Sequence, residues 1–257
     1  KKAREGVEVR FLYDDMGYPS VMVIMEPNKE SLIDNEQNEF HPAFIVNGEL
    51  KQRIYISKYQ NMVVGEFSDG TARPLSLKGV DARGNYSLAA TVQICKDKGR
   101  GWHLLTNAEY SLIALEAWKK GLFPRGNTDY GKSDELPTEK GVPSHITEGT
   151  TGRVLTGSGP ISWAHDGTPY GIYDLHGNMR DRVAGLQFVD REINIIPNND
   201  AAAHDADVMP NSDLWRSILS NGNLVEPGTA GSLGFVHHEG VFKIREDTTP
   251  YNFISVG

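Results

Sequence analysis

Cysteine is nearly absent from this sequence: Cys95 is the only one in 257 residues. A disulfide within the sequence is therefore excluded, and so is redox chemistry that needs a pair of cysteines. A fold without disulfides must be stabilised by packing, as expected for a protein that folds in a reducing cytoplasm. Cys95 lies on the apolar face of a predicted helix, one turn after Val92, which favours a buried core residue over a reactive thiolate.

Basic clusters and long apolar runs are also missing. The formal net charge is −8, and no basic run is longer than Lys1-Lys2 or Lys119-Lys120. No basic excess therefore offsets the repulsion between this chain and nucleic-acid phosphates or anionic lipids. No apolar stretch approaches the ~18–20 residues of a membrane span. The composition predicts a protein that neither binds nucleic acid nor inserts into a membrane.

The histidines show no spacing typical of a metal site. No i, i+2 or i, i+4 pair occurs among the scattered residues His41, His103, His145, His165, His176 and His204. His237 and His238 are adjacent, and neighbours in a strand point to opposite faces. We therefore predict no histidine metal site and interpret His103 and His176 as hydrogen-bonding supports.

Residues 1–50 are predicted to be rich in β-structure. Val7 to Phe11 alternate with charged residues, and Val21 to Met25 form a continuous apolar strand, so the two stretches are expected to pair as a hairpin. Exposed strand edges readily pair with another chain. We interpret residues 1–50 as an N-terminal extension that serves assembly, and residues 51–257 as the main domain.

Asn47-Gly48 suits a type I′ turn, here between strands at 44–46 and 54–56. A second hairpin is predicted over residues 183–196, turning near Asp190-Arg191. A short helix is expected at 211–220.

The main domain is predicted to contain helices near 86–98 and 107–120. The second helix has a strong start signal, because Thr106 is followed three residues later by Glu109, a capping box. Its apolar face is expected to carry Leu112, Leu115 and Trp118. Residues 121–170 are dominated by Gly, Pro, Ser and Thr, which predicts a long irregular segment.

Two punctuated stretches carry a resemblance to a known family. They are residues 101–110 (GWHLLTNAEY) and residues 171–185 (GIYDLHGNMRDRVAG), in which Gly177-Asn178 predicts a tight turn. In order and spacing the pair resembles the signatures of the formylglycine-generating-enzyme-like branch of the C-type lectin fold. The resemblance implies an α+β lectin-like domain over residues 51–257, with two helices packed on a twisted, mainly antiparallel sheet.

Departures from that family bear on function. The family's oxidase activity depends on a cysteine pair, so the lone Cys95 predicts no catalytic residue. The family's structural calcium site corresponds to Asn178 and Asp181, where oxygen ligands would suit calcium. Arg180 and Arg182 replace tryptophans of the family motif, and they offer Asp181 an ion pair instead of a metal. Structural calcium therefore stays an open alternative, and no other cofactor or metal is predicted.

Further runs, at residues 54–60, 98–109, 124–132, 155–160 and 183–200, are similar to phage and prophage virion proteins. Those proteins carry the lectin-like domain as a display scaffold, some of them in diversity-generating retroelement systems. The similarity covers roughly residues 44–225.

It implies a non-enzymatic virion protein, located in a tail, fibre or capsid surface and assembled in the bacterial host cytoplasm. Such a protein would bind a host cell-surface ligand, protein or glycan, and would contact other virion proteins and copies of itself. Two alternatives stay open: an enzyme of the formylglycine-generating or sulfoxide-synthase type, and a purely structural particle protein.

We expect the ligand to contact the irregular segment at 121–170 and the polar stretch at 197–213, because loops on a rigid scaffold vary without disturbing the core. Aromatic, imidazole and amide side chains stack and hydrogen-bond at low ordering cost. The predicted ligand-binding residues are Tyr130, Trp163, His165, Asn198 and Asn199. For Trp163 the alternative is that its ring anchors the loop to the core.

Overall fold

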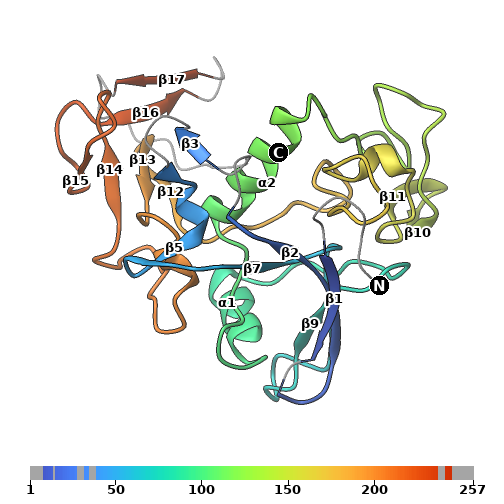
Figure 1. Cartoon of the computed structure of the whole chain (residues 1–257). Coiled ribbons are helices and arrows are strands. Elements are labelled where there is room, and N and C mark those ends of the chain that lie inside the picture. The colour runs from blue at the N-terminus through green and yellow to red at the C-terminus, as the bar shows by residue number, and fades with distance from the viewer. Residues whose placement is uncertain (1–7, 14, 28–31, 35–38, 237–240, 245–257) are drawn as a thin grey trace.

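The computed structural model describes residues 8–13, 15–27, 32–34, 39–236 and 241–244. These residues form two α-helices and several small antiparallel sheets, which confirms the α+β class. In Figure 1, helix α2 (Asn107–Lys119) lies between the C-terminal sheet and the segment at 121–170. No helix in the described part of the chain is long and apolar enough to span a bilayer.

The N-terminal strands belong to the main body. β1 (Glu8–Tyr13) pairs with β2 (Pro19–Met25) as the sequence predicted, and β2 also pairs with β7 (Ile54–Ser57). The sheet order is therefore β1-β2-β7. The domain boundary expected at residue 50 falls inside this sheet. β7 was expected to pair with residues 44–46, but it pairs with β2 instead.

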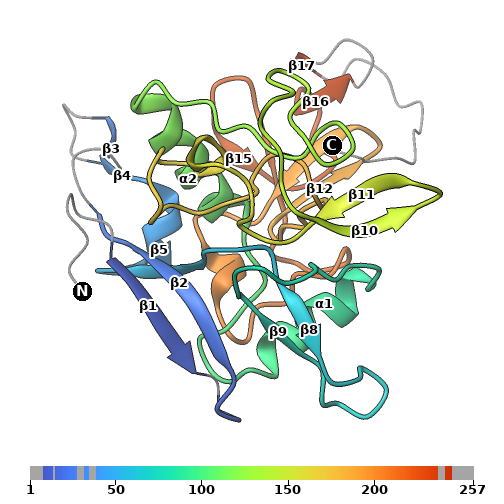
Figure 2. The same ribbon diagram turned by 90° about the vertical axis from the view of Figure 1, so that its right-hand side faces the viewer.

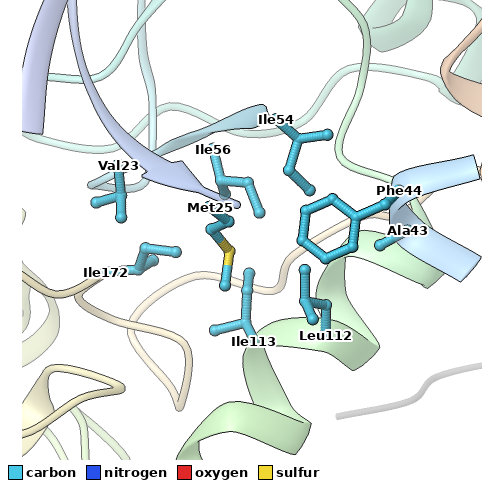
Figure 3. Packing of buried hydrophobic residues seen from close by; sticks show 9 residues of the cluster. All are labelled: Val23, Met25, Ala43, Phe44, Ile54, Ile56, Leu112, Ile113 and Ile172. Atoms are coloured by element: carbon cyan, nitrogen blue, oxygen red, sulfur yellow. The ribbon is translucent and has the colours of Figure 1, made fainter. Parts of the chain in front are cut away.

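The main hydrophobic core joins these strands to α2 (Figure 3). Phe44, at the end of the 3-10 helix η2 (Pro42–Phe44), is fully buried between β7 and α2. The cluster is contributed by β2, η2, β7, α2 and the 171–185 stretch, and comprises Val23, Met25, Ala43, Phe44, Ile54, Ile56, Leu112, Ile113 and Ile172. β2 and η2 are thus part of the core rather than of a separate extension.

Short two-stranded hairpins form separate small sheets. Asn47 and Gly48 form the predicted turn with φ of 51° and 76°, but they connect β5 (Ile45–Val46) to β6 (Glu49–Leu50). β3 (Leu32–Asp34) pairs with β4 (Glu39–Phe40). β8 (Met62–Val64) pairs with β9 (Arg73–Leu75).

α2 begins where the sequence predicted, and α1 (Leu88–Lys96) begins at Leu88 rather than near residue 86. Ser87 caps α1, and Thr106 caps α2. The α2 capping box is complete, because Thr106 Oγ1 accepts from Glu109 N at 3.1 Å and Glu109 Oε2 accepts from Thr106 N at 3.0 Å. The expected buried position of Trp118 is wrong: its side chain is 64% exposed, because Ile113 and Ala117 occupy the inner face instead.

The segment at 121–170 is more regular than predicted. β10 (Pro143–Thr147) and β11 (Thr150–Val154) form a hairpin that extends from the body in Figure 2. A 3-10 helix, η3 (Ile161–Trp163), follows.

The C-terminal sheet is built on the hairpin that the sequence predicted. β12 (Leu186–Val189) and β13 (Glu192–Ile195) flank Asp190 and Arg191, whose φ values are 47° and 68°. β13 also pairs with β14 (Arg216–Ile218) and β16 (Leu233–Val236). β15 (Leu224–Val225) and β17 (Val241–Ile244) complete the sheet, and η4 (Asp200–Ala202) precedes β14.

The helix expected at 211–220 is wrong. Ser217 is fully buried in β14, and its Oγ accepts a hydrogen bond from Asn194 Nδ2 of β13 at 2.8 Å. Trp215 is buried in a second hydrophobic cluster with Val208 and Ile196. Strand pairing and these contacts override the weak local helix pattern.

Candidate functional site

The two stretches that carry the family resemblance lie side by side. Ala184 N donates to Leu105 O at 2.9 Å, and Asn107 N donates to Ala184 O at 2.8 Å. A parallel bridge pairs Thr106 with Ala184. The start of α2 is therefore fixed directly to the end of the 171–185 stretch.

Gln60, just after β7, holds the predicted Gly177-Asn178 turn in place. Its Nε2 donates to Met179 O at 2.8 Å and contacts Asp174 O at 3.2 Å and Asp181 Oδ1 at 3.3 Å. Its Oε1 accepts from Asn178 Nδ2 at 3.1 Å. The turn has the expected positive φ, 78° at Gly177 and 62° at Asn178. One amide side chain thus links the segment after β7 to residues 174–181.

An open cavity of about 510 Å³ lies between α1, β7, the 98–105 loop and the 171–185 stretch. Buried apolar and aromatic side chains form its interior, among them Ile56, Tyr59, Ala82, Ile113, Ile172 and Tyr173. Exposed arginines surround its mouth: Arg83, Arg100, Arg180 and Arg182. Its size and apolar lining suit a small ligand or one group of a larger ligand.

Lys98 and Trp102 form part of the cavity wall. Lys98 is 2% exposed, and its ammonium group lies 4.3 Å from the centre of the Trp102 ring. Lys98 Nζ also donates to Pro74 O at 2.8 Å, so the charge is satisfied inside the protein. The lysine therefore fixes the indole in position.

Cys95 also lines the cavity, but its thiol is not activated. Burial raises the pKa of Cys95 to about 12, although the nearby Lys98 opposes the rise. A thiol with such a pKa is almost fully protonated at neutral pH and is a weak nucleophile.

His103 and Glu109 form a hydrogen-bonded pair at the inner side of the cavity, with Nε2 and Oε1 2.9 Å apart. Burial lowers the pKa of His103, but the Glu109 carboxylate and its hydrogen bond outweigh burial and raise the pKa overall. Burial raises the pKa of Glu109, but His103 and the hydrogen bond from the Thr106 amide outweigh burial and lower the pKa overall. The pair therefore favours the charged forms. His103 has the supporting role predicted for it, whereas His176 is exposed.

Two carboxyl groups next to the Gly177-Asn178 turn lie in surroundings that disfavour their charged form. Asp174 is fully buried; its Oδ2 accepts from Gly157 N at 2.7 Å, and its Oδ1 has no hydrogen-bond partner among the described residues. Burial raises its pKa to about 6, although the Gly157 hydrogen bond lowers it. Asp181 is exposed as a whole residue, yet desolvation of its carboxyl raises the pKa to about 7; Gln60 opposes the rise and Asp174 adds to it.

Replacing Asp174 with asparagine is expected to stabilise the protein above pH 6. A carboxyl whose pKa is raised on folding favours the fold when protonated, so its contribution is lost as the pH rises from about 4 to about 6. Asparagine keeps an acceptor for Gly157 N and tolerates the φ of 62°. Asp174→Asn should therefore gain on the order of 2 kcal/mol at pH 8 relative to the parent, and little at pH 4.

Urea unfolding of both proteins between pH 4 and pH 8 measures this difference. Asp174→Ala, which lacks the acceptor, is the control and should be less stable than Asp174→Asn throughout. A destabilisation by Asp174→Asn that does not change with pH would contradict the buried-charge account.

The side chain of Asn178 does not fit the calcium alternative. Its Oδ1 accepts from Val154 N at 2.8 Å, and its Nδ2 donates to Val154 O and Gln60 Oε1. Both ends of the amide therefore bind protein groups. Asp181 bonds to Gln60, and the expected ion pair with Arg180 or Arg182 does not occur among the described residues. Nor do the described residues include a group of three or more His, Cys, Asp or Glu able to hold a metal ion.

The five predicted ligand-binding residues do not form one surface. Tyr130 is 71% exposed on the 121–170 segment, and Asn198 is exposed beside a second cavity of about 420 Å³. The other three, Trp163, His165 and Asn199, are each at most 1% exposed.

Hydrogen bonds explain why these three are buried, and this corrects their expected position at the surface. Trp163 Nε1 donates to Glu139 Oε2 at 3.1 Å, and His165 Nδ1 accepts from Ile172 N at 2.8 Å. Asn199 bonds to Thr106 and Glu109 at the α2 cap. Trp163 therefore anchors its loop to the core, as the alternative interpretation held.

The cavity residues themselves were not predicted. Gln60 and the 98–105 loop belong to runs used for the family resemblance, but no spacing rule joins them to 171–185. Arg180 and Arg182 were the one sequence signal for this site, because a charged pair in place of the family's tryptophans indicates that the turn faces solvent. Both arginines are indeed exposed. No protein-family model matches this chain, and no curated protein matches it.

Proposed function

We propose that this chain is a non-enzymatic virion protein of a phage, with a C-type lectin-like fold, that binds a host cell-surface ligand. The observation that carries the proposal is the cavity at the junction of the 101–110 and 171–185 stretches. Both stretches line it, and both carry the resemblance to the formylglycine-generating-enzyme-like branch of the C-type lectin fold. In this proposal the chain sits in a tail, fibre or capsid surface and contacts other virion proteins and further copies of itself.

The enzyme alternative has less support. Formylglycine-generating chemistry would need a thiolate, and burial raises the pKa of Cys95 to about 12. A histidine-bound iron, as in a sulfoxide synthase, would need clustered ligands, and the described residues contain no group of three or more His, Cys, Asp or Glu able to hold a metal ion. A binding role needs only a preformed cavity with an accessible mouth. The half-buried Gln60 hydrogen bonds and the Lys98–Trp102 contact supply the rigid walls of such a cavity.

Filling the cavity should weaken attachment. Thr91 lies on α1 and lines the cavity, so Thr91→Trp places an indole inside it. Labelled protein is incubated with a panel of bacterial strains, and bound protein is measured by flow cytometry. We expect saturable binding to at least one strain, and a loss of about tenfold or more in affinity for Thr91→Trp, equivalent to about 1.4 kcal/mol.

Two further variants make the result specific. Ala89→Trp introduces the same side chain at an exposed position of α1 that does not line the cavity, and it should bind like the parent. Tyr130→Ala with Asn198→Gly tests the loop surface predicted from the sequence, and it should also bind like the parent. Loss of binding only in this loop variant would move the site to the loops. Absence of binding to every strain by the folded parent would contradict the proposed function.

A further inference from the structure

The cavity combines an apolar interior with a positively charged mouth. The buried aliphatic residues that line it, such as Ile56, Ala82, Ile113 and Ile172, offer no side-chain hydrogen-bonding groups. The aromatic rings of Tyr59, Trp102 and Tyr173 complete the wall. A ligand group that contacts these side chains must therefore be apolar, because a sugar ring with several hydroxyl groups would leave hydroxyls unpaired against them.

The charge at the mouth differs from that of the whole chain. Arg83, Arg100, Arg180 and Arg182 line the cavity, while the sequence has a net charge of −8. Arg83 lies over the Tyr86 ring at 5.9 Å. Arg100, Arg180 and Arg182 are exposed and form no ion pair with a described residue. Their guanidinium groups are therefore available to a ligand.

Acidic groups at the cavity do not cancel this charge. Glu109 is bonded to His103 and to the Thr106 amide, and it is only 2% exposed. Asp181 accepts a hydrogen bond from Gln60 on the turn between the two arginines. Lys98 Nζ donates to Pro74 O inside the wall.

We propose that the cavity binds an anionic group attached to an apolar body, with the acyl or aromatic part inside and the carboxylate or phosphate held by Arg180 and Arg182 at the mouth. Guanidinium groups bind both kinds of anion through paired hydrogen bonds. This inference takes the cavity as the binding site of the proposed function and specifies the chemistry of its ligand. It predicts an acidic, partly apolar group on the host-surface ligand.

Two fluorescent probes with the same aromatic body test the role of charge. 1-Anilinonaphthalene-8-sulfonate carries an anionic group, and N-phenyl-1-naphthylamine lacks it. We expect the full chain to bind the sulfonate about tenfold more tightly than the neutral probe, a difference of about 1.4 kcal/mol. The affinity for the sulfonate should fall as salt is raised, whereas the affinity for the neutral probe should not.

Variants assign the effect to the cavity. Arg180→Gln with Arg182→Gln should reduce sulfonate binding to about the level of the neutral probe. The control Lys120→Gln with Lys140→Gln removes the same charge from exposed positions that do not line the cavity, and it should bind like the parent. Thr91→Trp should weaken both probes. Circular dichroism of each variant confirms that it remains folded.

Competition identifies the anionic group. Octanoate and octyl phosphate are expected to displace the sulfonate probe, and the stronger competitor indicates whether a carboxylate or a phosphate is preferred. Octanol, which has the same chain without the charge, should compete poorly. Equal binding of both probes, equal displacement by octanol, or full binding by the double arginine variant would each overturn the inference.

The two proposals fail in distinguishable ways. Loss of cell attachment in Thr91→Trp, combined with charge-independent probe binding, would keep the cavity as the attachment site and reject the anionic ligand. Charge-dependent probe binding, combined with unchanged cell attachment in Thr91→Trp, would keep the anion site and reject its role in attachment.

Discussion

Deletion of residues 1–43 is expected to leave a chain that does not fold. The deletion removes β1 and β2, and with β2 the side chains of Met22, Val23, Ile24 and Met25, each at most 5% exposed. Burial of such a side chain contributes about 1.5–3 kcal/mol. The combined loss, roughly 6–12 kcal/mol, is comparable with the whole stability of a typical domain, about 5–15 kcal/mol.

This expectation differs from the one that follows from the sequence alone, where residues 1–50 form a separable extension. The measurement is near-ultraviolet circular dichroism together with limited proteolysis of the deleted chain. A protease-resistant, cooperatively unfolding product would restore the extension as a separate unit.

Point variants provide a milder form of the same test. Val23→Asp buries a charge in the cluster of Figure 3, where the valine is 1% exposed, and it should unfold the protein or lower its stability by more than about 3 kcal/mol. Val189→Asp makes the same change on β12, where the valine is 45% exposed, and should cost under about 1 kcal/mol. Equal effects of the two variants would contradict the role of β2 in the core.

Local sequence signals predicted the elements that depend on neighbouring residues alone. The capping box fixed the start of α2, and Asn47-Gly48, Gly177-Asn178 and Asp190-Arg191 all form turns with positive φ. The failures involve long-range contacts. β7 is paired with β2 across some thirty residues, and the segment around Ser217 is a strand because Asn194 and its neighbours pair with it. Hydrophobic periodicity does not reveal which partner a short apolar segment will find.

The candidate site was less predictable than the fold, for the same reason. The cavity depends on Gln60, the 98–105 loop and the 171–185 stretch, which are brought together by contacts between segments far apart in the sequence. Side-chain type was also a poor guide to exposure. Trp163 and Asn199 are residue types common in binding sites, but each is buried with hydrogen-bond partners that lie far away in the sequence. Trp118 was expected inside and is exposed.

Asn199→Ala is expected to lower the stability of the protein by about 2–4 kcal/mol, because each buried polar group left unpaired costs about 1–3 kcal/mol. Asn199 Nδ2 donates to Ala43 O at 2.9 Å and to Glu109 Oε1 at 3.1 Å, and its Oδ1 accepts from Thr106 Oγ1 at 2.6 Å. This one amide joins the η2 segment to the capping box of α2. The change should reduce the urea midpoint without changing the slope of the transition.

The neighbouring residue is the control for this prediction. Asn198 is exposed, and its φ of 52° is accessible to glycine, so Asn198→Gly removes an amide side chain without backbone strain. Its stability should stay within about 0.5–1 kcal/mol of the parent. Asn199→Ala with parental stability and weakened cell attachment would instead assign this residue to ligand binding. The opposite pattern, an unstable Asn199→Ala beside a stable Asn198→Gly, follows if Asn199 acts as the internal link between the N-terminal segment and α2.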